Sequence, residues 1–207
     1  ENVRVLAIER FDRFMSQDGR LLRVPQEDFC QALSVPPTRK YNNDGGPGIR
    51  ECLGLLAGSD YAEEDRLAFL KAQIVFWLIG ATDGHAKNFS LFLTPGGRYR
   101  MTPLYDIMSL QPNYAAKQLR RKEFRLSMAI GDNRYYAMES ILPYHFLEDA
   151  KAAGMAQDRA RSLFGSLGET IEGALERTAA IMPDDFPKLL VEGIGHAMRK
   201  RSAKLLT

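Results

Sequence analysis

The sequence predicts an α+β protein made mostly of α-helices, and three observations lead to that fold class. Two short segments near the beginning, residues 3–9 and 21–24, have the composition of strands. A second such pair, residues 89–93 and 98–101, flanks a turn near the middle of the chain. Elsewhere apolar residues recur at three- and four-residue steps, which is the spacing of buried helix faces. We therefore expect a few strands followed by many helices.

The first predicted unit is a strand with a hairpin, and it covers residues 1–24. Residues 3–9 are short, apolar and rich in β-branched side chains, as strands are. Asp18-Gly19 is a strong hairpin-turn signal, and residues 21–24 supply the returning strand. Because the chain opens at Glu1 directly before the first strand, we expect the sequence to begin inside a larger architecture.

Helical spacing begins after Pro25. Residues 28–33 predict a short helix, and residues 49–56 predict a second one. Between them, residues 40–48 are polar and rich in glycine, which indicates a loop.

The strongest helix prediction covers residues 63–79. Its second half, residues 74–79, is apolar on every face, so we expect it to be buried on all sides, with Trp77 in the core. Gly80 follows as a helix stop. The next residues, 81–88, should therefore leave the helix at the centre of the domain.

The remainder, after the central hairpin, is predicted to be helical. Pro143 and Pro187 stand where a first helical turn would begin, a position that tolerates proline. Asp184 and Asp185 are candidate caps for the last helix, which we expect near residues 186–205.

Length, charge, apolar runs and cysteines together indicate which class of protein this is. The chain has 207 residues, enough for one compact domain or one large lobe of a bigger enzyme. Its formal net charge of +2 gives no global signal for nucleic acid or membrane binding. The longest apolar run, residues 74–79, is far shorter than the roughly 20 residues of a membrane span. Cys30 and Cys52 form no CxxC pair, so we expect reduced, buried thiols in a cytoplasmic protein.

Three polar residues carry the strongest chemical signal. Asp83 and Asn88 have four residues between them, and Asp106 follows directly after the central hairpin. Phosphoryl transfer needs a carboxylate that orients the attacking hydroxyl, and an amide oxygen with a second carboxylate to hold magnesium. Oxygen ligands of this kind suit Mg²⁺ and not zinc.

Each feature has a plainer explanation when it stands alone. An Asp-Gly pair is more often a simple turn, and residues 44–48 lack the ending of a phosphate-binding P-loop. His85, His145 and His196 lack the spacing of a zinc site, so structural histidines are expected for the last two. The order of buried helix, Asp-x4-Asn loop, hairpin and aspartate is much more specific than any single motif.

Residues 79–90 (IGATDGHAKNFS) and 102–107 (TPLYDI) resemble the HipA family of bacterial serine/threonine kinases from toxin–antitoxin modules. Residues 7–12, 25–30 and 40–48 extend the resemblance through about the first half of the chain. It implies a fold similar to eukaryotic protein kinases, and ATP and Mg²⁺ as cofactors. Residues 25–207 would be the helical C-terminal lobe, with the central hairpin carrying the metal site. Residues 1–24 would be the hinge region.

The resemblance also implies roles for single residues. The catalytic set would be Asp83, His85 and Asn88. The magnesium ligands would be Asn88 and Asp106. Contacts to the nucleotide would come from Glu9, Phe11, His85, Lys87 and Tyr105. Ile107 replaces the phenylalanine that follows the metal aspartate in many kinases.

The family's phosphate-binding lysine and Gly-rich loop lie before the hinge, so we expect them to be absent from these residues. The partners implied are a protein substrate phosphorylated on Ser or Thr and a HipB-like helix-turn-helix antitoxin, with DNA reached only through that complex. Two alternatives stay open. The chain could be a catalytically incomplete module that binds the antitoxin, or a phosphotransferase acting on a small molecule. The basic cluster 117–125 could contact a partner or DNA, or be a solvated face.

Overall fold

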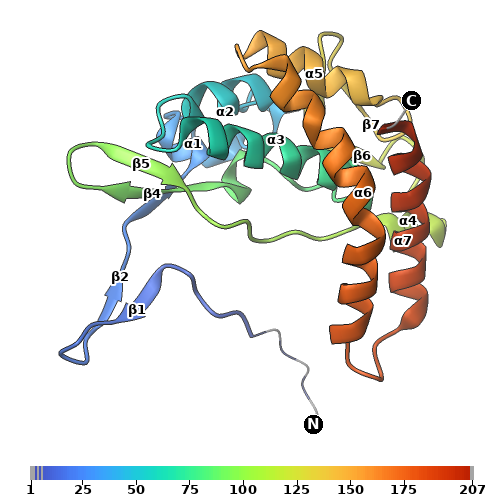
Figure 1. Ribbon diagram of the computed structural model, residues 1–207, viewed down its shortest axis with the longest axis horizontal. Helices are drawn as coiled ribbons and strands as arrows, with labels where there is room; N and C mark the ends of the chain where they lie inside the picture. Colours follow the sequence, from blue (N-terminus) through green and yellow to red (C-terminus); the bar gives the residue numbers. More distant parts are fainter. Residues whose placement is uncertain (1–2, 4, 6, 206–207) are drawn as a thin grey trace.

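The computed structural model describes residues 3, 5 and 7–205 of the chain. A helical body carries a small sheet on one side, a separate hairpin stands off near the N-terminus, and two long antiparallel helices lie at the other end (Figure 1). The observed class is α+β with helices predominating, as the sequence predicts. No helix within the described part of the chain combines the length and apolarity needed to cross a bilayer.

The N-terminal hairpin consists of β1 (Arg13–Met15) and β2 (Leu21–Arg23), paired antiparallel around a turn in which Gly19 has φ = 79°. The predicted turn and second strand are confirmed, but the first strand is misplaced. Residues 3, 5 and 7–9 form no strand, and residues 4 and 6 lie outside the described residues. The side chains of Val3, Val5 and Ile8 are 76%, 83% and 73% exposed, so they find no face to pack on.

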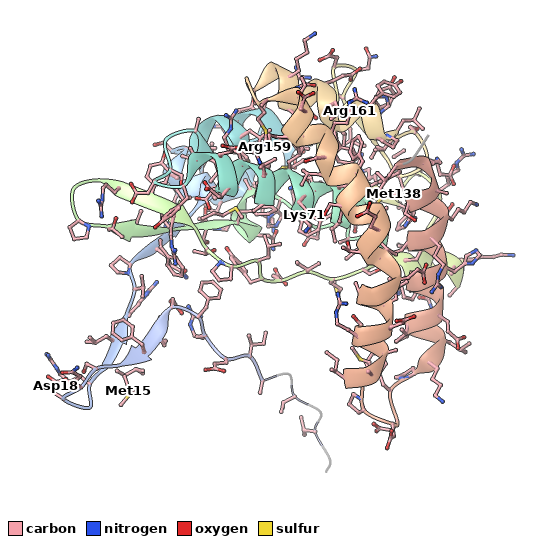
Figure 2. All side chains as sticks on the ribbon, viewed as in Figure 1. Met15, Asp18, Lys71, Met138, Arg159 and Arg161 are labelled. Carbon is pink, nitrogen blue, oxygen red and sulfur yellow. The ribbon has the colours of Figure 1, made fainter. Side chains whose placement is uncertain are left out.

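Asp12 anchors this hairpin. Its buried carboxylate accepts hydrogen bonds from Arg10 at 2.8 Å and from Arg13, and Arg23 lies 3.7 Å away. The hydrogen bond from Arg10, together with the one from Arg13, lowers the pKa of Asp12 to about 2. Met15 and Asp18, by contrast, project away from the helical body at the hairpin tip (Figure 2).

The sheet of the body has three strands, β3 (Gln26–Asp28), β4 (Ser90–Thr94) and β5 (Arg98–Met101), in the order β3-β4-β5. The predicted central hairpin is therefore confirmed, and β3 is an addition that the sequence reading missed. Asp28 ends β3 and caps α1 (Phe29–Ala32), because its carboxylate accepts the Gln31 N–H at 2.9 Å.

The next helices follow the prediction. The segment between α1 and the next helix contains short 3-10 turns at Pro37–Arg39 and Asn42–Asp44, of which the second lies in the predicted polar loop. α2 (Ile49–Leu56) and α3 (Ala62–Ile79) then pack against each other.

The end of α3 lies in the core, as the sequence predicts. Ile74, Trp77 and Leu78 are fully buried, and the Trp77 indole N–H donates to the Met138 carbonyl at 3.1 Å. Gly80 ends the helix with φ = 73°. Cys30 and Cys52 are buried free cysteines, also as expected.

The prediction of an all-helical remainder is wrong. After the short α4 (Gln111–Ala115), the chain forms a third hairpin from β6 (Arg125–Ile130) and β7 (Tyr135–Ala137). Leu126, Met128 and Ile130 alternate toward the core on β6, which is the pattern of a half-buried strand.

The C-terminal helices are α5 (Pro143–Ala152), α6 (Gln157–Ile181) and α7 (Lys188–Ser202), followed by a 3-10 turn at Ala203–Leu205. Pro143 begins α5 as predicted. Pro187, not Asp184 or Asp185, occupies the cap position of α7, and within the described residues no side chain caps that helix, so the predicted aspartate caps are wrong. The aspartates instead belong to the turn between the two long helices.

Arg201 joins α7 to the body. Its guanidinium donates to the Leu78 carbonyl at 2.8 Å and to the Gln111 side chain at 2.7 Å. Part of the basic end of α7 is therefore used inside the fold and does not merely face solvent.

Candidate active site

The loop of residues 83–88 leaves the core end of α3 and packs back against that helix. A Cβ atom added at Gly84 would lie 2.4 Å from the Phe76 ring, so only glycine allows this approach. From the other side, the Ser127 hydroxyl of β6 donates to the Thr82 carbonyl at 2.6 Å. The loop then forms a 3-10 turn, Ala86–Asn88, and enters β4. Its position is thus set by α3, β4 and β6.

Asn88 and Asp106 meet at one end of this loop. The Asn88 amide donates to the Asp106 carboxylate at 2.7 Å, and the His85 backbone N–H donates to the Asn88 side-chain oxygen at 3.2 Å. Asn88 is buried, whereas Asp106 is exposed and has φ = 56°. That left-handed conformation is uncommon for a residue with a side chain, although aspartate tolerates it better than most.

Hydrogen bonds also join the segment after Asp106 to the end of α3. After Asp106, the Leu110 N–H donates to the Gly80 carbonyl at 2.9 Å, and the Ser109 hydroxyl donates to the Ile79 carbonyl at 2.6 Å. The segment that carries Asp106 is therefore tied to the helix end from which the Asp83 loop starts.

Asp83 lies at the other end of the loop with its side chain 55% exposed. The Tyr41 hydroxyl donates to Asp83 Oδ1 at 3.2 Å. His85 Nε2 lies 4.0 Å from the same oxygen, and the His85 ring packs edge-on against Tyr41. Burial lowers the pKa of His85, and the Asp83 carboxylate opposes that shift.

One ring nitrogen of His85 lacks a partner. Nδ1 is buried and makes no hydrogen bond with any residue that the structure describes. A buried polar atom without a partner costs free energy, so it is suited to a group that binds next to it.

The remaining predicted site residues divide into two groups. The Tyr105 hydroxyl donates to the Lys87 carbonyl at 2.9 Å and lies 2.7 Å from the Ser90 hydroxyl, while Phe11 stacks obliquely on Tyr105 with ring centroids 6.0 Å apart. Phe11 and Tyr105 are thus brought together beside the loop.

Lys87 and Glu9 are placed differently. The Lys87 ammonium donates to Asp28 at 2.6 Å, and this bond raises the pKa of the lysine. The positive charge of Lys87 is therefore already paired with the Asp28 carboxylate at the start of α1. Glu9 is exposed in the irregular segment before β1, and the described residues offer it no hydrogen bond or ion pair.

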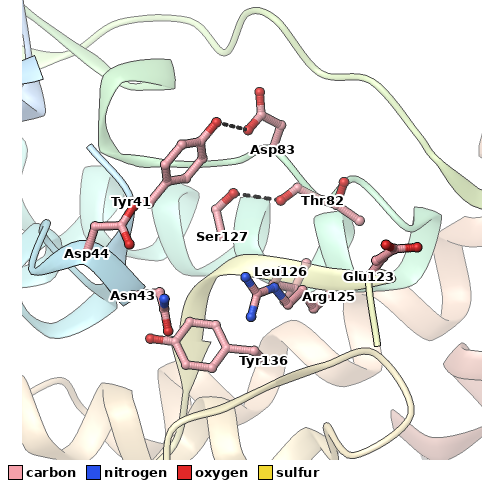
Figure 3. A pocket seen from close by; sticks show the side chains of 10 residues that line it. All are labelled: Tyr41, Asn43, Asp44, Thr82, Asp83, Glu123, Arg125, Leu126, Ser127 and Tyr136. Atoms are coloured by element: carbon pink, nitrogen blue, oxygen red, sulfur yellow. Dashed lines mark hydrogen bonds between the residues drawn. The ribbon is translucent and has the colours of Figure 1, made fainter. Parts of the chain in front are cut away.

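A pocket of about 360 Å³ opens beside Asp83 (Figure 3). Its wall comes from the 40–48 segment, the start of the loop and the β6–β7 hairpin. The lining residues are Tyr41, Asn43, Asp44, Thr82, Asp83, Glu123, Arg125, Leu126, Ser127 and Tyr136. Neither Asn88 nor Asp106 belongs to this wall, so Asp83 is the one member of the three that lines the pocket.

Most of this wall was missed by sequence reasoning. Tyr41 lies in the quoted 40–48 motif, but only its contact with Asp83 reveals a role at the site. Ser127 and Tyr136 belong to the hairpin that the helical prediction overlooked, although the alternation in residues 125–130 was a visible signal.

The chemistry of the donors fits magnesium bound together with a phosphate group. Asn88 and Asp106 offer one amide and one carboxylate, and Mg²⁺ is commonly held by one or two carboxylates plus substrate phosphates and water. Within the described residues, no group of three or more His, Cys, Asp or Glu side chains is arranged to hold a metal alone. On the same loop, the buried Nδ1 of His85 is a further polar atom that a phosphate could satisfy.

Comparison with known proteins identifies the family. The model of the HipA-like C-terminal domain matches residues 1–175. The chain belongs to the HipA-like C-terminal domain family. "Putative kinase Y4mE" of Sinorhizobium fredii is 35% identical over 86% of this HipA-like chain. The serine/threonine-protein kinase toxin HipA of Shewanella oneidensis is 28% identical over 87% of it.

One solved structure agrees with this family assignment. The complex of Shewanella oneidensis HipA, HipB and operator DNA contains a similar chain, with a TM-score of 0.81 and 25% identity over 96% of this HipA-like domain. The domain spans less than half the length of these three relatives, 42% of each of the two curated proteins and 48% of the solved HipA chain.

Proposed function

We propose that this HipA-like domain supplies the catalytic loop and the magnesium ligands of an ATP-dependent serine/threonine protein kinase. The observation that carries the proposal is the arrangement along one short loop. Asp83 stands at a pocket, and Asn88 contacts Asp106 at the opposite end. Phosphoryl transfer needs both functions in one site, a residue that orients the acceptor hydroxyl and ligands for the magnesium that binds the phosphates.

In this proposal Asp83 accepts a hydrogen bond from the substrate hydroxyl and orients it for attack. The acceptor segment enters from the pocket beside Asp83. Asn88 and Asp106 would hold Mg²⁺, which neutralises charge on the phosphates when it is bound. Burial lowers the pKa of His85, and its partnerless Nδ1 would bond a phosphate oxygen.

The remaining assignments are also part of the proposal. Residues 1–24 would form the hinge, with Glu9 and Phe11 at the adenine, and residues 25–207 the helical lobe. Tyr105 would support that side of the nucleotide. Lys87 would reach the cofactor only by leaving Asp28, so it is the weakest of these contacts.

We further propose a HipB-like helix-turn-helix antitoxin as partner. The support is the solved HipA structure, which contains HipB and operator DNA. DNA would be reached through that complex. A domain that binds the antitoxin without catalysing phosphoryl transfer is the second candidate, and the same structure supports it.

Calorimetry with Mg²⁺–ATP tests the nucleotide site directly in this chain. We expect binding that is lost in Asp106→Ala and retained in Asp158→Ala, which removes an exposed carboxylate from the start of α6. Absence of binding in the unmodified chain would contradict a nucleotide site in this domain and favour the antitoxin-binding role.

Kinase assays on the complete protein that carries this domain test the role of Asp83. Asp83→Asn should reduce phosphorylation of Ser or Thr roughly 100-fold or more, the usual range for a positioned acid–base group. Unchanged activity would show that the assignment is wrong.

A further inference from the structure

Tyr41 reaches the candidate catalytic aspartate from a separate part of the chain. Its hydroxyl donates to Asp83 Oδ1 at 3.2 Å across a sequence separation of 42 residues. Its ring packs against His85 with centroids 5.1 Å apart, and the Lys40 ammonium lies 4.9 Å from the ring centroid. Figure 3 shows the phenol spanning the pocket edge toward the carboxylate.

The backbone that carries Tyr41 is firmly held. The neighbouring Asn42 is buried, and its side-chain oxygen accepts from the Ala129 N–H at 3.3 Å, from Arg134 at 3.2 Å and from the Tyr136 hydroxyl at 3.1 Å. These donors all belong to the β6–β7 hairpin. The phenol is therefore presented from a fixed base, not from a mobile loop.

The turn after Tyr41 is equally compact. The Asn42 amide donates to the Gly46 carbonyl at 3.0 Å, and the Gly46 N–H donates to the Tyr41 carbonyl at 2.9 Å. A Cβ atom on Gly46 would lie 2.2 Å from the Arg39 carbonyl oxygen, so this glycine is required by the close approach of two backbones.

Asp83 needs such a restraint. Its side chain is more than half exposed, and an exposed aspartate normally samples several rotamers. Tyr41 engages Oδ1, whereas Oδ2 has no hydrogen bond within the described residues. One oxygen is thus fixed by the protein and the other is left for an incoming donor.

Building on the proposed function, we propose that Tyr41 is a positioning residue for phosphoryl transfer. Its hydroxyl holds the Asp83 carboxylate in one rotamer, so that the second oxygen meets the substrate hydroxyl arriving through the pocket. The β6–β7 hairpin supports this role by anchoring Asn42.

The first test measures the Asp83 rotamer by NMR in the 207-residue chain, without any need for activity. Couplings to the Asp83 methylene protons should report one staggered χ1 rotamer in the unmodified chain and averaged values in Tyr41→Phe. Tyr99→Phe is the matched control, because it removes a phenol bond to the Leu55 carbonyl away from the site. Averaging already present in the unmodified chain, or a single rotamer retained in Tyr41→Phe, would overturn the proposal.

The second test is kinetic and uses the complete protein. Tyr41→Phe should lower kcat about tenfold at unchanged KM for ATP, as expected when a hydrogen bond to a charged group is lost. In an Asp83→Asn background the same change should have no further effect, because the two residues act as a unit.

The outcomes separate the two proposals. If Tyr41→Phe still lowered kcat tenfold in the Asp83→Asn background, Tyr41 would act on another part of the site, and the proposed function would remain intact. Wild-type activity in Asp83→Asn itself would instead remove the proposed function, and the NMR result would still decide whether Tyr41 fixes the carboxylate.

Discussion

His145 illustrates at the scale of one residue how burial and hydrogen bonding set protonation. Its ring is 2% exposed, stacks on Tyr135 with centroids 4.1 Å apart, and accepts the Leu142 N–H through Nδ1 at 3.1 Å. Burial lowers the pKa of His145 below its ordinary value of 6.5, partly opposed by Glu148. The acceptor role requires the neutral ring, so the fold selects one protonation state.

We therefore expect stability to fall as the pH drops below about 6.5, the pKa that the histidine regains in the unfolded chain. The unfolded chain then binds a proton that the folded protein excludes. Urea unfolding at pH 7.5 and 5.5 checks this with His145→Asn, which keeps an acceptor near Nδ1 but does not titrate in this range. The variant should lose less stability than the unmodified chain over that interval. His85 contributes to the dependence that remains, because burial lowers its pKa as well.

His196→Asn is the control for that measurement. An equal pH dependence in the His145 and His196 variants would show that the buried ring does not cause the effect.

Single residues of the site were predictable where spacing along the chain carried the information. The sequence points to Asp83, Asn88 and Asp106 as candidates because the loop and hairpin between them have local signals. Tyr41 was not identified, since its contact with Asp83 depends on how the β6–β7 hairpin holds Asn42. The pairing of Lys87 with Asp28 escaped for the same reason, because it joins the loop to the start of α1.

At the scale of elements, the packing of the 83–88 loop on α3 decides where the site lies. Gly84 lets the loop backbone touch the Phe76 ring, so the loop inherits the fixed position of a buried helix. The Asp-Gly pair that looked like a generic turn is thus used for close packing. Gly84 has no positive φ, so the requirement is for space and not for backbone freedom.

Gly84→Ala should therefore destabilise the domain by about 1–3 kcal/mol, the usual range for overpacking, and weaken Mg²⁺–ATP binding by displacing Asn88. Urea unfolding and calorimetry measure the two effects. Gly54→Ala is the matched control in α2, where an added Cβ meets nothing within 4 Å. That variant should be neutral or more stable, by up to about 1 kcal/mol. Equal behaviour of the two variants would contradict the packing argument.

Elements were predictable when one hydrophobic period repeated over many residues. α2 and α3 were placed almost to the residue, because eight or more residues repeat the helical spacing. β3 is only three residues long and finds its partner β4 far along the chain, so local pattern could not reveal it. The β6–β7 hairpin was not predicted because its segment was assigned to helices throughout, although buried and more exposed residues alternate at the start of β6.

At the scale of the whole molecule, the core and the N-terminal hairpin are separate in their packing. The main hydrophobic cluster draws on α1, α2, α3, β4, β6, α5 and α6. Among the described residues, β1 and β2 contribute nothing to it, and Phe14, Met15 and Leu21 are 50%, 63% and 66% exposed. The hairpin is held mainly by its own backbone pairing and by the arginines around Asp12.

Hydrogen exchange should expose this difference. Amides of β1 and β2 should exchange through local opening, roughly 100-fold or more faster than those of α3, which need global unfolding. The β4–β5 hairpin is the internal control, because it has similar pairing but packs on the core. Equal protection of the two hairpins would mean that β1 and β2 are buried against another surface in solution.

The hydrogen bond between the Leu110 N–H and the Gly80 carbonyl has a practical consequence. The candidate residues Asp83 and Asp106 lie inside a segment whose two ends are joined by the hydrogen bond from the Leu110 N–H to the Gly80 carbonyl, while its far tip is the exposed Gly96-Gly97 turn. Added Cβ atoms at that tip meet nothing within 4 Å. Because Gly96 and Gly97 have φ of 85° and 74°, a side chain at either position would be strained, whereas extra residues inserted between them would lengthen only the outer end of the hairpin. The tip therefore offers an attachment point from which the domain can be followed without changing the spacing of Asn88 and Asp106.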